Sequence, residues 1–121
     1  MNNDKGEILI YKTEDGITEI DVRLEDETVW LTQQQLADLY QSSKSNVSEH
    51  IKHIFEDEEL DEKSVVRNFR TTAADGKNYN VKYYNLDMIL SIGYRILSKI
   101  ATKFRQWATE HLKEETWNIL I

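Results

Sequence analysis

The sequence predicts one α+β domain spanning residues 1–121, in which a helix-turn-helix is combined with β-hairpins. Two Asp-Gly pairs, Asp15-Gly16 and Asp75-Gly76, stand between β-rich runs, which is the strongest short-range signal for a hairpin. Apolar residues recur at helical spacing between the two hairpins and again after the second one. A chain of 121 residues, 40% of them hydrophobic, is long enough to bury one continuous core.

The first hairpin is predicted over residues 7–12 and 18–24. In its second strand Ile20, Val22 and Leu24 alternate with charged residues, so one face of that strand should be buried. A third short strand over residues 27–31 should lead the chain into the first helix.

Two short helices should follow this strand. Thr32 is a suitable N-cap for a helix over residues 33–40, with Gln35 as the partner in a capping box. Ser43 or Ser45 can cap a second helix that ends at about residue 55 or 56. The apolar stripe of this second helix consists of Val47, Ile51, Ile54 and Phe55.

The two helices and the tight turn between them match the pattern of a helix-turn-helix. Ala37 is small where the helices should cross, and Gln41 stands where this motif usually has glycine. With Val47 and Ile51 pointing inward, a helical wheel turns the polar residues of the second helix outward. The residues expected to contact DNA bases from this face are Asn46, Glu49, Lys52 and His53. The alternative is two amphipathic helices that pack a core and expose a solvated face.

A second hairpin is predicted over residues 65–73 and 78–84. A three-residue loop, with Gly76 in the left-handed conformation, pairs Phe69 with Val81, whereas a two-residue loop would set Phe69 against Lys82. We expect the three-residue loop. It also pairs Arg67 with Tyr83 and Thr71 with Tyr79, and gathers Asn68, Arg70, Asn80 and Lys82 on the opposite face.

A basic hairpin after a helix-turn-helix is typical of the wing of a winged helix, where it would hold DNA phosphates. The predicted phosphate contacts are Lys44, Ser45, Arg67, Arg70, Lys77 and Lys82. The alternative is an exposed ribbon whose Lys and Arg residues only protect a sheet edge from aggregation.

The formal net charge of −7 argues against binding to a polyanion, but the charges are unevenly distributed. Residues 63–82 carry five basic residues and one acidic residue. A basic island on an acidic body can contact phosphates locally, with a strong dependence on salt.

Two helices should complete the domain, one capped by Asn85 and running to residue 97, the other starting at Ser98. The residues predicted to be buried across the domain are Leu36, Val47, Ile51, Phe69, Ile89, Ile92, Phe104 and Trp107. The apolar tail should dock on the domain or pair with a second copy in a homodimer, because Trp117, Ile119, Leu120 and Ile121 are unlikely to stay solvated.

Several classes of function receive no support from the sequence. The chain has no cysteine, and it has no Ser-His-Asp arrangement, Gly-rich phosphate loop or carboxylate pair above chance, so we expect no catalysis, no cofactor and no metal. His50 and His53 lie three residues apart, but the spacing fixes no third metal ligand. No membrane-spanning run and no secretory signal are present, so we expect a cytoplasmic protein that does not enter membranes.

The stretch over residues 83–98, Tyr-Tyr-Asn-Leu-Asp-Met-Ile-Leu-Ser-Ile-Gly-Tyr-Arg-Ile-Leu-Ser, is followed by Phe104, Arg105 and Trp107. Together with residues 30–40 and 46–55 it resembles the virulence-associated RhuM family of bacteria, and the resemblance covers about residues 7–113. More remotely, the order of elements is similar to the Bro-N and KilA-N domains of phage antirepressors and viral DNA-binding proteins.

The resemblance implies a DNA-binding or transcription-regulatory domain of a phage- or mobile-element-associated protein, with double-stranded DNA as its partner. The alternative that it leaves open is an antirepressor-type module, which would bind a repressor or its own C-terminal region instead of DNA. RhuM-like proteins usually continue after the Phe-Arg-x-Trp helix, so the resemblance also leads us to expect that a C-terminal part is missing here.

Overall fold

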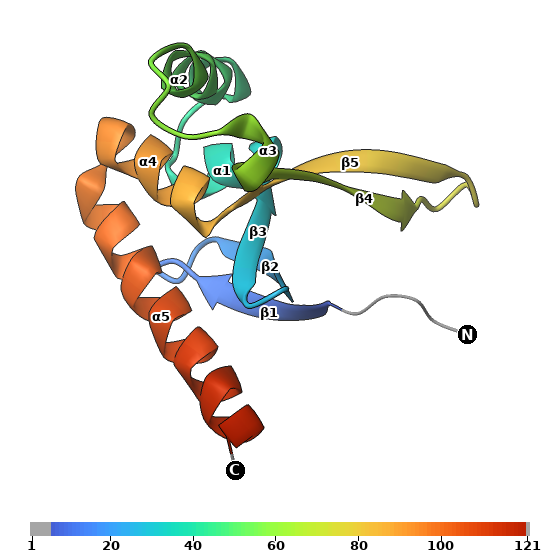
Figure 1. Ribbon diagram of the computed structural model, residues 1–121. Helices are drawn as coiled ribbons and strands as arrows, with labels where there is room; N and C mark the ends of the chain where they lie inside the picture. The colour runs from blue at the N-terminus through green and yellow to red at the C-terminus, as the bar shows by residue number, and fades with distance from the viewer. Residues whose placement is uncertain (1–5, 121) are drawn as a thin grey trace.

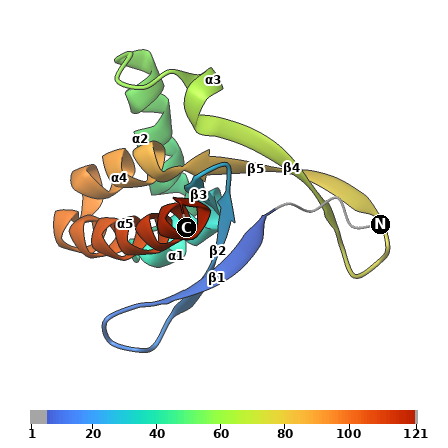
Figure 2. The same ribbon diagram turned by 60° about the horizontal axis from the view of Figure 1, so that its bottom comes forward.

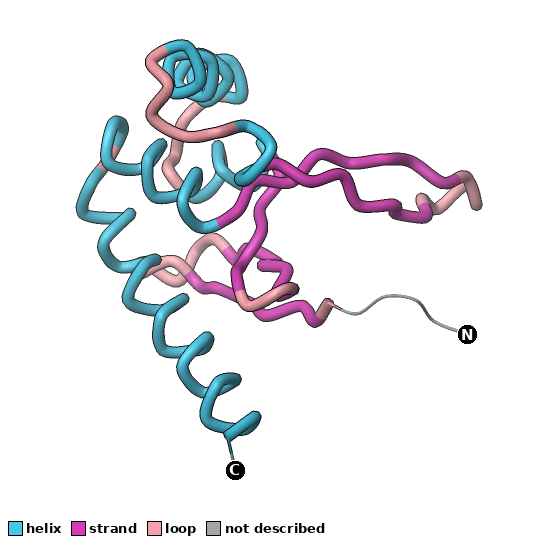
Figure 3. Tube along the Cα trace, viewed as in Figure 1, coloured by secondary structure: helices cyan, strands magenta, loops and turns pink. Residues whose placement is uncertain are grey.

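The computed structural model describes the backbone of residues 6–120 and the side chains of residues 6–113, and shows a mixed α+β fold (Figure 1). Five strands form one antiparallel sheet in the order β1-β2-β3-β5-β4. The strands are β1 (Glu7–Lys12), β2 (Glu19–Glu25), β3 (Thr28–Thr32), β4 (Val66–Thr72) and β5 (Asn78–Asn85). The helices are α1 (Gln33–Leu39), α2 (Lys44–Glu56), α3 (Glu62–Val65), α4 (Leu86–Ile96) and α5 (Ser98–Leu120), and Figure 3 shows them gathered on one side of the sheet.

The N-terminal hairpin forms as the sequence predicts. Its register pairs Tyr11 with Ile20, and Gly16 takes the left-handed conformation with φ of +75°. The turn between β2 and β3 has only two residues, Asp26 and Glu27. Both have positive φ, which matches the twist of the two strands that they join.

The strand β3 joins the two hairpins into one sheet, which local sequence patterns did not predict. It pairs with β2 on one side and with β5 on the other, where Leu31 lies opposite Tyr84. The second hairpin is therefore anchored at its root and extends outward from the sheet.

The second hairpin, β4 and β5 with the turn between them, is called the arm below, because it projects away from the body (Figures 1 and 2). Its register confirms the prediction of a three-residue loop: Phe69 lies opposite Val81 and Arg67 opposite Tyr83. Gly76 has a φ of +84°, as the loop requires.

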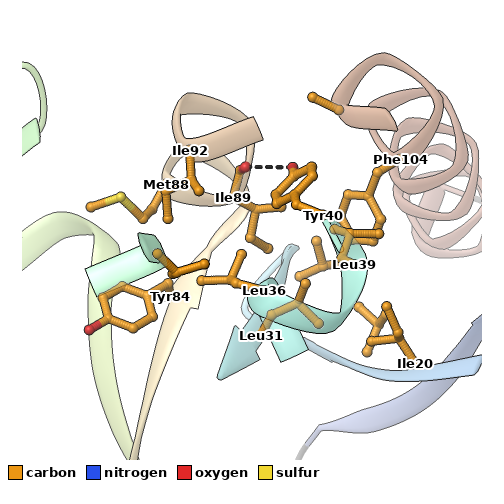
Figure 4. Packing of buried hydrophobic residues seen from close by; sticks show 14 of the residues in the cluster. Ile20, Leu31, Leu36, Leu39, Tyr40, Tyr84, Met88, Ile89, Ile92 and Phe104 are labelled. Carbon is orange, nitrogen blue, oxygen red and sulfur yellow. Dashed lines mark hydrogen bonds between the residues drawn. The ribbon is translucent and has the colours of Figure 1, made fainter. Parts of the chain in front are cut away.

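The core lies between the sheet and the helices (Figure 4). Near its centre the Tyr40 hydroxyl donates a hydrogen bond of 2.7 Å to the Ile89 carbonyl. The prediction of burial is confirmed for Leu36, Val47, Ile51, Phe69, Ile89, Ile92 and Phe104.

The prediction that Trp107 is buried is wrong. Its ring packs edge-on against the Tyr11 ring, with centroids 5.1 Å apart, but the side chain remains partly exposed at the margin of the core. The reason is its position around the helix: Ala101, Phe104 and Ala108 form the fully buried stripe of α5, and Trp107 lies at the border of that stripe.

The two C-terminal helices meet at Leu97, whose φ of −157° and ψ of 83° break the helical path. The predicted cap is confirmed, since the Asn85 side chain accepts a hydrogen bond from the Met88 amide. The one-turn helix α3 was not predicted. The apolar tail of residues 117–121 lies outside the described side chains.

Candidate nucleic-acid interface

The turn between α1 and α2 lies where the sequence predicts a helix-turn-helix, and both helices have side-chain caps. Thr32 and Gln35 form the predicted capping box, and of the two predicted caps Ser43 is the one used, accepting from the Asn46 amide. Gln41 has a φ of +53°, the left-handed conformation that glycine adopts most easily. The sequence therefore places a strained glutamine at the position where this motif usually has glycine.

The outer face of α2 carries the four predicted base contacts. Val47, Ile51 and Ile54 are buried on the inner side of the helix. Asn46, Glu49, Lys52 and His53 are exposed on the other side, as are Lys44 and Ser45 at its N-terminal end.

Local contacts hold some of these polar groups in place. The Asn46 amide nitrogen donates to the Ser42 hydroxyl at 2.8 Å, which keeps the amide at the N-terminal end of α2. His53 Nε2 lies 4.0 Å from a Glu49 carboxylate oxygen one turn away. His50 does not share this face: it is partly buried, and burial lowers the pKa of its imidazole.

The arm presents the predicted polar face. Cross-strand pairs place Asn68 beside Lys82 and Arg70 beside Asn80, and all four are exposed. Strand alternation puts them on the same face as buried Tyr84, the face that the helices cover nearer the body. Two cations and two amides thus continue the helix-bearing face of the sheet beyond the helices.

The same face extends further along the arm than the sequence predicts. The Thr72 hydroxyl donates to the Asn78 side-chain oxygen at 2.8 Å, and both residues are exposed near the tip. Thr72 lies two positions after Arg70, and Asn78 lies two positions before Asn80. Strand alternation therefore puts both on this face, and the sequence pattern could have predicted them. Lys77 is exposed in the turn itself.

Arg67 lies on the opposite face of the arm. Its guanidinium sits over the Trp30 ring, 4.6 Å from the centroid, and forms ion pairs with Asp26 and with Glu25, the latter at 3.8 Å. Trp30 is buried but stands outside the main core cluster. The structure therefore separates Arg67 from Arg70 and Lys82 and gives it packing partners within the fold.

The far end of α2 is strongly acidic. The segment 57–62 carries five carboxylates, which Arg95 partly offsets through contacts of 3.6 Å with Asp57 and 3.3 Å with Glu59. A polyanion would be repelled from this end of α2 and tolerated at its N-terminal end.

Among residues 6–113 no group of three His, Asp or Glu side chains is arranged to hold a metal ion. A cavity of about 440 Å³ lies between the first hairpin and the α4–α5 junction, lined in part by Tyr11 and Leu97 and bordered by a 2.6 Å ion pair between Glu14 and Lys103. In the described part of the chain no helix has both the length and the apolarity needed to cross a membrane.

Comparison with protein families gives a match over part of the chain. No curated protein and no solved structure matches the chain significantly. Residues 64–118, which run from the end of α3 through the arm and α4 into α5, match the Virulence protein RhuM family. The resemblance carried by the Phe-Arg-x-Trp helix is thus confirmed over this part of the chain.

Proposed function

We propose that this domain is a non-enzymatic DNA-binding module of a RhuM-type regulatory protein. In this proposal the N-terminal half of α2 enters the major groove of a DNA duplex, and the polar face of the arm contacts the phosphates beside it. Asn46, Glu49, Lys52 and His53 then face the base edges, while Arg70, Lys77 and Lys82 of the arm and Lys44 and Ser45 of α2 contact the backbone.

The order of elements supports this proposal. A winged helix contains a strand, two helices joined by a tight turn, and then a hairpin. The second strand of the hairpin pairs with the strand that precedes the helices, as β5 pairs with β3 here. In this chain those parts are β3, α1, α2 and the arm. Figures 1 and 2 show α2 and the arm projecting from the body, with α3 between them.

The observation that carries the proposal is the composition and placement of the polar face of the arm. It holds Arg70 and Lys82 with four neutral hydrogen-bonding side chains and contains no carboxylate. It belongs to the sheet face that α1 and α4 cover, the two helices against which α2 packs. Cations alone can protect a sheet edge from aggregation, so that role does not explain the row of amides and the hydroxyl beside them. Phosphate binding uses both kinds of group.

The proposal is tested by selecting preferred duplexes from a random library and measuring their affinities by fluorescence anisotropy. Glu49→Gln should raise affinity for non-specific duplex and relax the preference at one base pair, because glutamate repels phosphate and accepts only from cytosine N4. Glu110→Gln on α5 removes the same charge from an exposed position and should leave the preference unchanged. Failure of the wild-type domain to bind any duplex at low salt would refute the proposal.

The net charge favours a second candidate, an antirepressor-type module that binds a protein. The charge of −7 and the acidic segment 57–62 at the end of α2 would suit a basic partner surface. A repressor or a further part of the same protein would be such a partner. This candidate predicts no duplex binding, and binding to the partner that weakens when the carboxylates of residues 57–62 are neutralised.

A further inference from the structure

The outer edge of the sheet at β1 differs from an ordinary protected edge. The strand is the last in the sheet order, and its outward side chains Ile8 and Ile10 are 55% and 60% exposed. Natural edge strands usually carry charges, proline or a bulge at such positions. On β1 the corresponding cation, Lys12, stands only at the end of the strand.

The hydrogen-bonding groups of this edge can be assigned from the hairpin. The Thr13 amide donates to the Thr18 carbonyl at 2.9 Å, in the same register that pairs Tyr11 with Ile20. Hydrogen-bonded pairs recur at every second residue of an antiparallel ladder, so the odd-numbered residues of β1 bond to β2. The amides and carbonyls of Ile8 and Ile10 therefore point to the open edge.

We propose that β1 is a self-association edge, where a second copy of the chain adds its own β1 antiparallel and extends the sheet. This inference does not depend on DNA binding. A two-fold axis through Leu9 sets Ile8 of one copy against Ile10 of the other, twice, with Leu9 facing Leu9. A register shifted by one residue is excluded. It would set residues whose amides and carbonyls point to the open edge opposite residues whose amides and carbonyls point to β2, so the new strand pair could not form its hydrogen bonds.

The same register is electrostatically complementary. It places Lys12 of one copy opposite Gly6 of the other, and Gly6 has no side chain to fill the space. The Glu25 carboxylate occupies that space, because a Cβ atom on Gly6 would lie 2.7 Å from Glu25 Oε1. Each Lys12 ammonium, now 3.5 Å from Glu19 of its own chain, would thus also face Glu25 of the second copy.

The helix α5 leaves room for the added strand and offers it a surface. Figure 1 shows α5 beside the sheet and continuing past β1, and Figure 2 shows the C-terminal end of α5 pointing out of the body. Trp107 is only partly buried at this margin. The second copy of β1 would cover the part of α5 that has no sheet beneath it in the single chain.

Sedimentation equilibrium of the wild-type chain tests the proposal, with a reversible dimer of twice the 14.3 kDa chain mass expected. Ile10→Lys should raise the dimer Kd by about tenfold or more, since a lysine ammonium would be placed against Ile8 of the second copy. It should not unfold the monomer, because the new ammonium lies opposite Asp21 on β2. The matched control is Ile17→Lys in the hairpin turn, where the side chain is 82% exposed, and it should leave the Kd unchanged.

A cysteine scan tests the register, since the chain has no cysteine of its own. Leu9→Cys should form a disulfide-linked dimer on mild oxidation, because facing Cα atoms in a pair without hydrogen bonds are about 4.5 Å apart. Ile17→Cys should give little cross-linked product. A wild-type chain that stays monomeric, dimers that persist in folded Ile10→Lys, or equal cross-linking at both positions would each overturn the proposal.

Discussion

Tyr40 and Gly93 pack so closely that a Cβ atom on Gly93 would lie 2.3 Å from the Tyr40 hydroxyl oxygen and 2.6 Å from the Ala101 Cβ atom. This contact joins the end of α1 to α4 and α5, and so holds α1 and the turn after it against the two C-terminal helices. Glycine is required here for close approach, since its backbone is ordinary helix.

Gly93→Ala should therefore destabilise the domain, by about 1 to 3 kcal/mol, because overpacking outweighs the better helix propensity of alanine. Urea unfolding followed by circular dichroism measures the loss. Ser91→Ala, two residues earlier on the same helix, is the control and should change the free energy of unfolding by less than about 1 kcal/mol. Equal stability of Gly93→Ala and wild type would show that α1 and α4 are not packed this closely.

Tyr40→Phe tests the hydrogen bond to the Ile89 carbonyl and should cost about 1 kcal/mol near neutral pH. Burial raises the pKa of the Tyr40 hydroxyl above the value of about 10 that it has in the unfolded chain. Its contribution to stability is thus complete below pH about 10 and is lost above it, because the unfolded chain releases a proton that the folded chain keeps. The free energy of unfolding of Tyr40→Phe should consequently fall less steeply with alkaline pH than that of wild type; parallel curves would contradict the assignment.

Gln41→Gly should stabilise the domain by about 1 kcal/mol, because glycine adopts the left-handed conformation of this turn without a steric penalty. Thermal unfolding gives the measurement. Ser42→Gly, at the next residue of the same turn, should not stabilise, because no positive φ has to be relieved there. A Gln41→Gly variant with a lower Tm than wild type would mean that the glutamine side chain makes a compensating contact.

Arg67→Ala tests whether this arginine is structural, in contrast to Arg70, which is proposed to contact DNA. The contact with Trp30 and the exposed ion pair with Asp26 predict a loss of stability of about 1 kcal/mol. The dependence of duplex affinity on salt should stay as in wild type. A shallower salt dependence without loss of stability would instead make Arg67 a phosphate contact.

Local sequence signals predicted the parts of this fold that short-range physics decides. Asp75-Gly76 fixed the arm register, and the caps at Thr32, Ser43 and Asn85 were recognised because each needs only a side chain and an amide three residues away. The polar face of the arm followed from that register.

Long-range pairing explains what the sequence did not predict. The pairing of β3 with β5 joins segments about 50 residues apart, and the ion pair between Arg67 and Asp26 spans 41 positions. The predicted register already put Arg67 and Arg70 on opposite faces of the arm. No periodicity specifies Asp26 as the partner of Arg67, however, so both arginines were predicted to be phosphate contacts because of their charge. The partial exposure of Trp107, at the border of the buried stripe of α5, likewise depends on which elements pack beside that helix.

The most direct test of the proposed function compares the salt dependence of duplex binding in three proteins. Arg70→Ala/Lys82→Ala removes the two cations of the polar face of the arm, and Arg105→Ala/Lys113→Ala removes two exposed cations from α5, so both variants have the same net charge. We predict that the slope of log affinity against log salt becomes shallower by about 2 in the arm variant, because roughly one counterion is released per neutralised phosphate, and stays at the wild-type value in the α5 variant. Equal slopes in all three folded proteins would contradict the assignment of the arm to DNA.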